Sequence, residues 1–123
     1  VSTDIWVDIE SKRLGKTYSE IFTDYMPTAV NLMAEQVVFA RDHEHTIIWD
    51  QTSTTVKSRE RKFRMLPEYD HIAVVFRTPE LDVLKERLAN RPGKEIPWEV
   101  VQGMIDNWDE PYEEEGFKEI WYV

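Results

Sequence analysis

The clearest candidate for chemistry is Asp50, which directly follows the apolar run Thr46–Trp49. This run predicts a buried strand of a parallel sheet, and open parallel sheets bind ligands at the carboxyl ends of their strands. A carboxylate at that edge can hold a magnesium ion through water, as in many enzymes that transfer phosphate. The alternative is a helix cap, because the Asp-x-Thr pattern of Asp50–Thr52 also begins turns.

A second candidate is the basic segment 87–94. Arg87 and Arg91 are four residues apart, which predicts that they share one helix face and could bind one oligoanion such as a triphosphate. Lys94 follows a Pro-Gly turn, and together these residues are typical of a movable basic flap. The alternative is a solvated helix end, where cations complement the helix dipole.

A third candidate is the run Ser58–Lys62, which contains Arg59. A helix that begins there would offer free backbone N–H groups, and these could bind phosphate together with an arginine. Exposed charge on an amphipathic helix explains the run equally well.

Gly15-Lys16-Thr17 copies the last three residues of the phosphate-loop pattern G-x-x-x-x-G-K-[ST]. However, Glu10 stands where the first glycine belongs, and no strand precedes it. A side chain at that point would block the backbone nest that binds phosphate. We therefore interpret these residues as the end of a helix.

The composition excludes several classes of function. The chain has 24 acidic and 15 basic residues and a net charge of -9, which argues against coating nucleic acid by bulk attraction. It has no cysteine, which excludes disulfides, thiolate nucleophiles and cysteine-bearing zinc sites. Its apolar runs are far shorter than the ~20 residues of a membrane-spanning helix. No signal peptide is visible, so we expect a cytoplasmic protein with no membrane partner.

The pattern of apolar residues predicts an α/β fold in which strands alternate with helices. Continuous apolar runs predict three strands, at Thr46–Trp49, His71–Phe76 and Glu119–Val123. Helical spacing and caps predict five helices: one from the cap at Ser2-Thr3-Asp4 to just before Gly15, then Tyr18–Ala40, Ser58–Leu66, Pro79–Leu88 and Pro97–Trp108. We expect Pro27 to kink or restart the second of them. The length of 123 residues indicates a single domain, 1–123, with a parallel sheet and right-handed crossovers.

In this order the segments resemble the P-loop kinases of the polynucleotide kinase type, a group that includes bacteriophage polynucleotide 5′-hydroxyl kinase and zeta-toxin-like kinases with an AAA-type ATP-binding domain. The resemblance covers nearly the whole chain. It rests on Val1–Asp4, Lys16–Tyr18, Ile47–Ser53, Arg59, Arg87 with Arg91, and Lys94-x-Ile96-Pro97. The usual Asp-x-Thr-Asn of the family is here Asp50-Gln51-Thr52-Ser53. The resemblance implies a three-layer fold, ATP and Mg²⁺ as cofactors, and a nucleotide or a 5′-hydroxyl nucleic-acid end as partner.

The resemblance also implies roles for individual residues. Asp4 matches the general base that accepts the proton of the attacking hydroxyl, and Asp50 matches the acid near the metal. Arg91 matches the lid arginine that stabilises the phosphoryl group in transit, with Arg87, Lys94 and Arg59 as further phosphate-binding residues. Family members that work on 3′-phosphorylated ends have an arginine three residues after the base. Val7 stands at that position here.

The sequence departs from this family most at its front. In the family, an apolar strand, the glycine-rich phosphate loop and a helix precede the Asp4 segment, and this chain begins after them. We therefore expect the chain as printed not to phosphorylate a substrate. The preceding strand is central in such sheets, between the strands represented here by Thr46–Asp50 and His71–Phe76, so its absence would expose two apolar edges. Either a start has been lost, the two strands close up, or a partner chain supplies the strand, for example in a homodimer.

Three hypotheses follow. The first is an ATP-dependent phosphotransferase domain similar to polynucleotide 5′-hydroxyl kinase. The second is a non-catalytic module that uses a kinase scaffold to bind a nucleotide, nucleic acid or protein. The third is a structural subunit that dimerisation completes.

Overall fold

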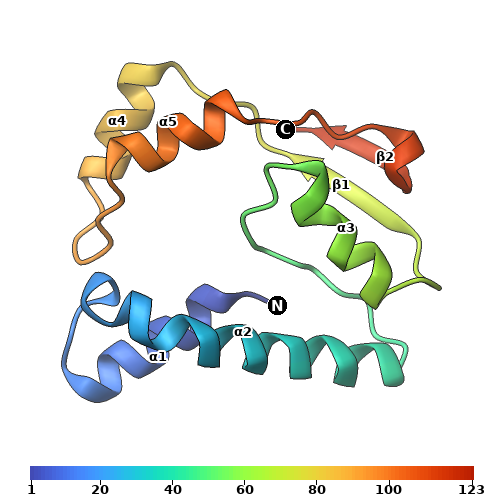
Figure 1. Ribbon diagram of the computed structural model, residues 1–123, viewed down its shortest axis with the longest axis horizontal. Coiled ribbons are helices and arrows are strands. Elements are labelled where there is room, and N and C mark those ends of the chain that lie inside the picture. The colour runs from blue at the N-terminus through green and yellow to red at the C-terminus, as the bar shows by residue number, and fades with distance from the viewer. The chain divides into compact units, whose positions relative to one another are not determined.

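The computed structural model describes residues 1–123, which divide into two compact units. Unit 1 consists of Val1–Thr52 and Arg91–Glu95, and unit 2 consists of Ser53–Asn90 and Ile96–Val123. Figure 1 labels the helices and strands of both units. None of the helices is long and apolar enough to cross a membrane.

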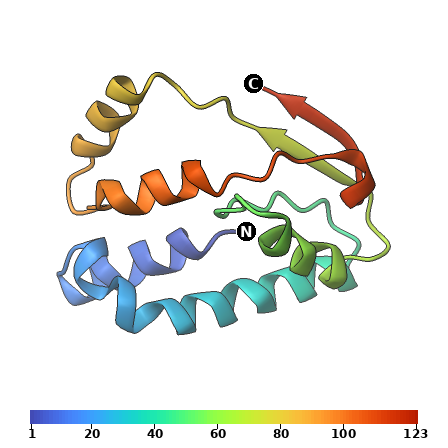
Figure 2. The ribbon, with the colours of Figure 1, turned by 45° about the horizontal axis from the view of Figure 1, so that its top comes forward.

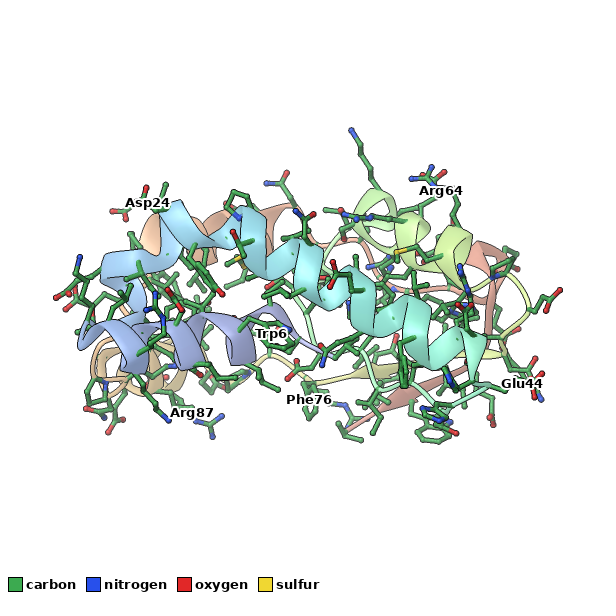
Figure 3. All side chains as sticks on the ribbon, turned by 90° about the horizontal axis from the view of Figure 1, so that it is seen from below. Trp6, Asp24, Glu44, Arg64, Phe76 and Arg87 are labelled. Atoms are coloured by element: carbon green, nitrogen blue, oxygen red, sulfur yellow. The ribbon has the colours of Figure 1, made fainter.

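Unit 1 is built on two long helices, α1 (Thr3–Leu14) and α2 (Tyr18–Asp42), which pack against each other (Figures 1 and 2). The apolar contact between them is a cluster of Val7, Ile21 and Ala29, in which Val7 and Ala29 are fully buried. At the edge of this contact, the indole Nε1 of Trp6 donates to Gln36 Oε1 over 3.1 Å. Figure 3 shows Trp6 on the side of α1 that faces α2.

Capping residues set both ends of α1, as expected, and the start of α2. The Ser2 side chain accepts a hydrogen bond from the backbone N–H of Asp4, and Gly15 ends α1 with a φ of 67°, a conformation that favours glycine. Thr17 then caps α2 through a capping box with Glu20. The interpretation of Gly15-Lys16-Thr17 as a helix end is confirmed. The helix α2 continues through Pro27, so it does not restart there, and the alternative of a kink at Pro27 stays a prediction.

The strand expected at Thr46–Trp49 does not form. Instead, the amino group of Val1 donates to the carbonyl of Ile48, and the backbone N–H of Asp50 donates to the carbonyl of Val1 over 2.9 Å. These two bonds have the pattern of a single parallel bridge. The prediction was wrong because an apolar run becomes a strand only where a neighbour offers a continuous row of backbone partners, and the bridge to Val1 is one residue long.

Unit 2 contains a parallel sheet of two strands, β1 (His71–Val75) and β2 (Phe117–Tyr122). Figure 2 shows the two strands side by side and pointing the same way. The other elements of this unit are α3 (Val56–Met65), α4 (Leu81–Ala89), α5 (Trp98–Asp106) and the 3₁₀ turn η1 (Glu113–Glu115). Two of the three expected strands and all five expected helices are thus confirmed within a few residues.

The chain is therefore a mixed α/β protein with five helices and a small parallel sheet. Within the sheet, β2 is the hydrogen-bonded neighbour of β1. The sheet has two strands, β1 and β2, and the expected closing up of Thr46–Asp50 against His71–Phe76 stays a prediction. The three-layer arrangement and the single domain stay predictions.

A buried ion pair holds unit 2 together. The Arg59 side chain is 5% exposed and that of Glu115 is 4% exposed. The guanidinium donates from Nε to Glu115 Oε1 over 2.6 Å and from Nη2 to Oε2 over 3.1 Å, while Nη1 donates to the carbonyl of Ser53 over 3.0 Å. This pair joins α3 to η1, and its two residues are 56 positions apart in the sequence.

We expect Glu115→Gln to destabilise the protein by about 3 kcal/mol, because it leaves a buried guanidinium without its counter-charge. Urea unfolding followed by circular dichroism measures this loss. The matched control is Asp70→Asn, which breaks the exposed ion pair with Lys118 and should cost less than about 1 kcal/mol. Equal losses for the two variants would show that burial of the Arg59 pair contributes nothing to stability.

Candidate functional site

The candidate site is centred on Asp4, in the first turn of α1. The hydroxyl of Tyr18, the first residue of α2, donates to Asp4 Oδ1 over 2.7 Å. Asp4 is exposed, and its second oxygen, Oδ2, accepts no hydrogen bond from within the protein. One oxygen is thus fixed while the other faces solvent, an arrangement that suits a carboxylate that accepts a proton.

The basic segment Arg91–Glu95 belongs to the same unit and begins with a turn. The backbone N–H of Lys94 donates to the carbonyl of Arg91 over 3.1 Å, and Gly93 between them has a φ of 76°. Proline followed by glycine is the pattern of a turn that needs a positive φ at its third residue. The expected Pro-Gly turn is therefore confirmed.

This segment is held by the residues that connect α1 to α2. The backbone N–H of Ser19 donates to the carbonyl of Gly93 over 3.0 Å, and the Ser19 hydroxyl accepts from the backbone N–H of Glu95 over 2.8 Å. The Lys94 ammonium lies 4.7 Å from the centre of the Tyr18 ring and donates to Asp8 Oδ2 over 3.1 Å. The base candidate Asp4 and the cation Lys94 thus share a neighbour, Tyr18.

Burial raises the pKa of the Tyr18 hydroxyl well above its ordinary value. The hydrogen bond to Asp4 and the negative charges of Asp4 and Asp8 raise it further, and the positive charge of Arg91 opposes them. Arg91 is itself exposed. The structure therefore brings Asp4, Lys94 and the charge of Arg91 to the surroundings of one tyrosine.

Asp50 lies in unit 1 as well, and its carboxylate is exposed. Its backbone N–H donates to the carbonyl of Val1, which connects Asp50 to the residues that lead into α1. Asp50 caps no helix, because Thr55 is the residue that caps α3. The helix-cap alternative for Asp50 is therefore wrong.

Arg87 and Arg91 do not share a helix face. The helix α4 ends at Ala89 with Asn90 as its cap, so Arg87 is in its last turn and Arg91 is outside it. The prediction was wrong because Pro92 disfavours the helical conformation of the residue before it. Arg87 is exposed in unit 2, whereas Arg91 belongs to unit 1. In Figure 3 the Arg87 side chain extends away from the ribbon.

The groups expected to bind phosphate at the start of α3 have partners inside the protein. The backbone N–H of Val56 donates to Asp109 Oδ2 over 2.9 Å, and that of Ser58 donates to the side chain of Thr55 over 3.1 Å. All three nitrogens of the Arg59 guanidinium donate to Glu115 or Ser53. In this structure Arg59 stabilises the packing of unit 2, and its role in phosphate binding stays a prediction.

Residues 1–113 match the AAA domain family, so the chain belongs to this family of P-loop NTPase-like, nucleotide-binding domains. Comparisons with curated proteins and with solved structures found no match. Domains of this family generally bind ATP together with Mg²⁺.

Some side chains of unit 1 have the chemistry to contact ATP and Mg²⁺. Mg²⁺ keeps several of its waters and is bound through one or two carboxylates besides phosphate oxygens, and Asp50 is one exposed carboxylate of this kind. Arg91 and Lys94 carry positive charge of the kind that binds phosphates, and the Lys94 ammonium is paired with Asp8. Gly15 and Lys16 offer no cradle, because their backbone N–H groups donate to Lys12 and Ser11 within the end of α1.

Sequence reasoning missed Tyr18 and Asp8 as members of the site. Tyr18 is part of the segment that carries the resemblance, but a tyrosine after a helix cap has no motif of its own. The one available signal was the four-residue spacing of Asp4 and Asp8, which places both acids on one face of α1.

We expect the Tyr18 hydroxyl to remain protonated at pH values where an ordinary tyrosine ionises, near 10. Because its pKa is higher in the folded than in the unfolded chain, its stabilising effect is complete below the unfolded pKa and is lost as the pH rises through the folded pKa. NMR titration of ring-labelled tyrosines measures this pKa, and Tyr18→Phe assigns the signal. In Asp4→Asn the pKa of Tyr18 should fall toward the ordinary value, and an unchanged pKa in that variant would contradict the proposed pairing.

Proposed function

We propose that this chain contains the base and the lid of an ATP-dependent phosphotransferase domain of the polynucleotide kinase type. The observation that carries the proposal is the arrangement around Asp4. Its exposed carboxylate is fixed at one oxygen by Tyr18, in the unit that also contains Asp50, Arg91 and Lys94. Membership of a nucleotide-binding family supports the same conclusion.

In the proposed reaction, Asp4 Oδ2 accepts the proton of an acceptor hydroxyl. The acceptor oxygen then bonds to the γ-phosphorus of ATP while the bond from that phosphorus to the bridging oxygen breaks, and ADP leaves. Arg91 stabilises the negative charge on the phosphoryl group in transit, and Lys94, in the same unit, adds positive charge. Bound Mg²⁺, held through water by Asp50, would neutralise charge on the phosphates.

The proposed acceptor is a hydroxyl of a nucleoside or of a nucleic-acid end without a 3′-phosphate. Val7 occupies the position at which an arginine would contact a 3′-phosphate, and it is fully buried between α1 and α2. That position therefore offers neither charge nor surface to an acceptor. The net charge of -9 further disfavours a long polyanion as substrate.

Asp4→Asn should abolish phosphate transfer, with a loss of about 10²-fold or more, because an amide cannot accept the proton. The measurement is transfer of labelled phosphate from ATP to a 5′-hydroxyl oligonucleotide and to nucleosides. The enzyme is the protein as its gene encodes it, with any residues ahead of Val1, since residues 1–123 contain no phosphate loop. Asp24→Asn, an exposed acid on α2 (Figure 3), is the control and should keep full activity. Full activity of Asp4→Asn would remove Asp4 from the mechanism.

Arg91→Ala should lower turnover by ~10³-fold if Arg91 stabilises transferred charge as an arginine finger does. The same assay measures it, with KM for ATP determined in parallel to separate turnover from binding. Arg61→Ala removes an exposed arginine of α3 and serves as the control. A loss below tenfold in Arg91→Ala would reduce Arg91 to a surface cation.

The second hypothesis, a non-catalytic module, predicts a different pattern in these assays. Nucleotide would bind to the gene-encoded protein, as measured by calorimetry, but none of the tested acceptors would receive phosphate. Asp4→Asn would then leave nucleotide affinity unchanged.

A further inference from the structure

We propose that Tyr18 is a positioning residue that contacts both the proposed general base, Asp4, and the lid segment, Arg91–Glu95. Its hydroxyl orients Asp4, and its ring helps to hold the lid segment in place. The inference rests on the proposed function and adds a residue to it. It is argued from contacts within unit 1.

The first contact is the hydrogen bond from the Tyr18 hydroxyl to Asp4 Oδ1. An exposed carboxylate on the first turn of a helix can otherwise rotate freely, and only some of its rotamers would point Oδ2 at an acceptor hydroxyl. Tyr18 is half-buried and packs beside the cluster of Val7, Ile21 and Ala29, so its hydroxyl has a defined position. The bond therefore selects one orientation of Asp4, and proton transfer depends on such an orientation.

The second contact is between the Tyr18 ring and Lys94. The ammonium lies over the ring at 4.7 Å from its centre, within the range of a cation–π interaction. Ser19, which follows Tyr18, makes two further hydrogen bonds to this segment, to Gly93 and to Glu95. A Cβ at Gly93 would lie 3.3 Å from Cβ of Thr17, so the turn lies close to the start of α2. These contacts hold the turn that begins at Arg91.

Two variants separate the two contacts. Tyr18→Phe removes the hydroxyl but keeps the ring, so it frees Asp4 and leaves the Lys94 contact and the packing in place. Tyr18→Leu removes both contacts. The matched control is Tyr122→Phe, which removes a tyrosine hydroxyl that also donates to a carboxylate, Glu110, but belongs to unit 2.

The experiment measures kcat and KM of phosphate transfer in the gene-encoded protein. For Tyr18→Phe we expect kcat to fall about tenfold with KM for ATP little changed, because only orientation of the base is lost. Tyr18→Leu should in addition raise KM for ATP.

A double variant tests whether the two residues act as a unit. Asp4→Asn with Tyr18→Phe should be no slower than Asp4→Asn alone, because Tyr18 acts through Asp4. The inference is overturned if Tyr18→Phe matches Tyr122→Phe in kcat, or if the effects of Asp4→Asn and Tyr18→Phe on kcat multiply in the double variant. Should Tyr18→Phe fail to fold, the titration of Tyr18 in wild type and in Asp4→Asn decides, and an identical pKa in both overturns the inference.

These outcomes distinguish the inference from the proposed function. An inactive Asp4→Asn variant together with a fully active Tyr18→Phe variant overturns the role of Tyr18 and leaves the base in place. A fully active Asp4→Asn variant overturns the proposed function itself.

Discussion

The packing of α1 against α2 is the contact on which the candidate site depends. Val7 and Ala29 are fully buried in it. Burial of an aliphatic side chain the size of valine contributes roughly 1.5–3 kcal/mol, whereas one hydrogen bond contributes about 1 kcal/mol net. The apolar contact therefore determines where the helices lie. Asp4 is three residues before Val7 and Tyr18 is three residues before Ile21, so the same contact brings the carboxylate to the hydroxyl.

Local features of the chain were predictable from the sequence. The cap at Ser2 and the stop at Gly15 act within one helical turn, and so do their sequence signals. The Pro-Gly turn at Pro92-Gly93 is equally local. The error at Arg87 and Arg91 was avoidable, because Pro92 restricts the residue before it and already argues against a helix through Arg91. The four-residue spacing of Arg87 and Arg91 suggested a shared helix face, but the restriction that Pro92 places on Arg91 outweighs it.

Features that join distant parts of the chain were not predictable. The run Thr46–Trp49 has the composition of a strand, but composition does not show whether a partner ladder lies beside it. Arg59 was a candidate phosphate ligand because a surface arginine and a buried one look alike in a sequence. Its partner Glu115 is one of several acids near the end of the chain, and nothing local distinguishes it from its neighbours.

The distribution of charge around Tyr18 is compatible with the proposal that Asp4 acts as a base next to cations. A lysine paired directly with Asp4 would stabilise its charge and oppose proton transfer to it. Instead, Lys94 pairs with Asp8, and Asp4 has no ion pair within 4 Å. A neutral hydroxyl fixes Asp4 without neutralising it. Tyr18 thus contacts both the proposed base and Lys94, and a serine at this position would lack the ring for the second contact.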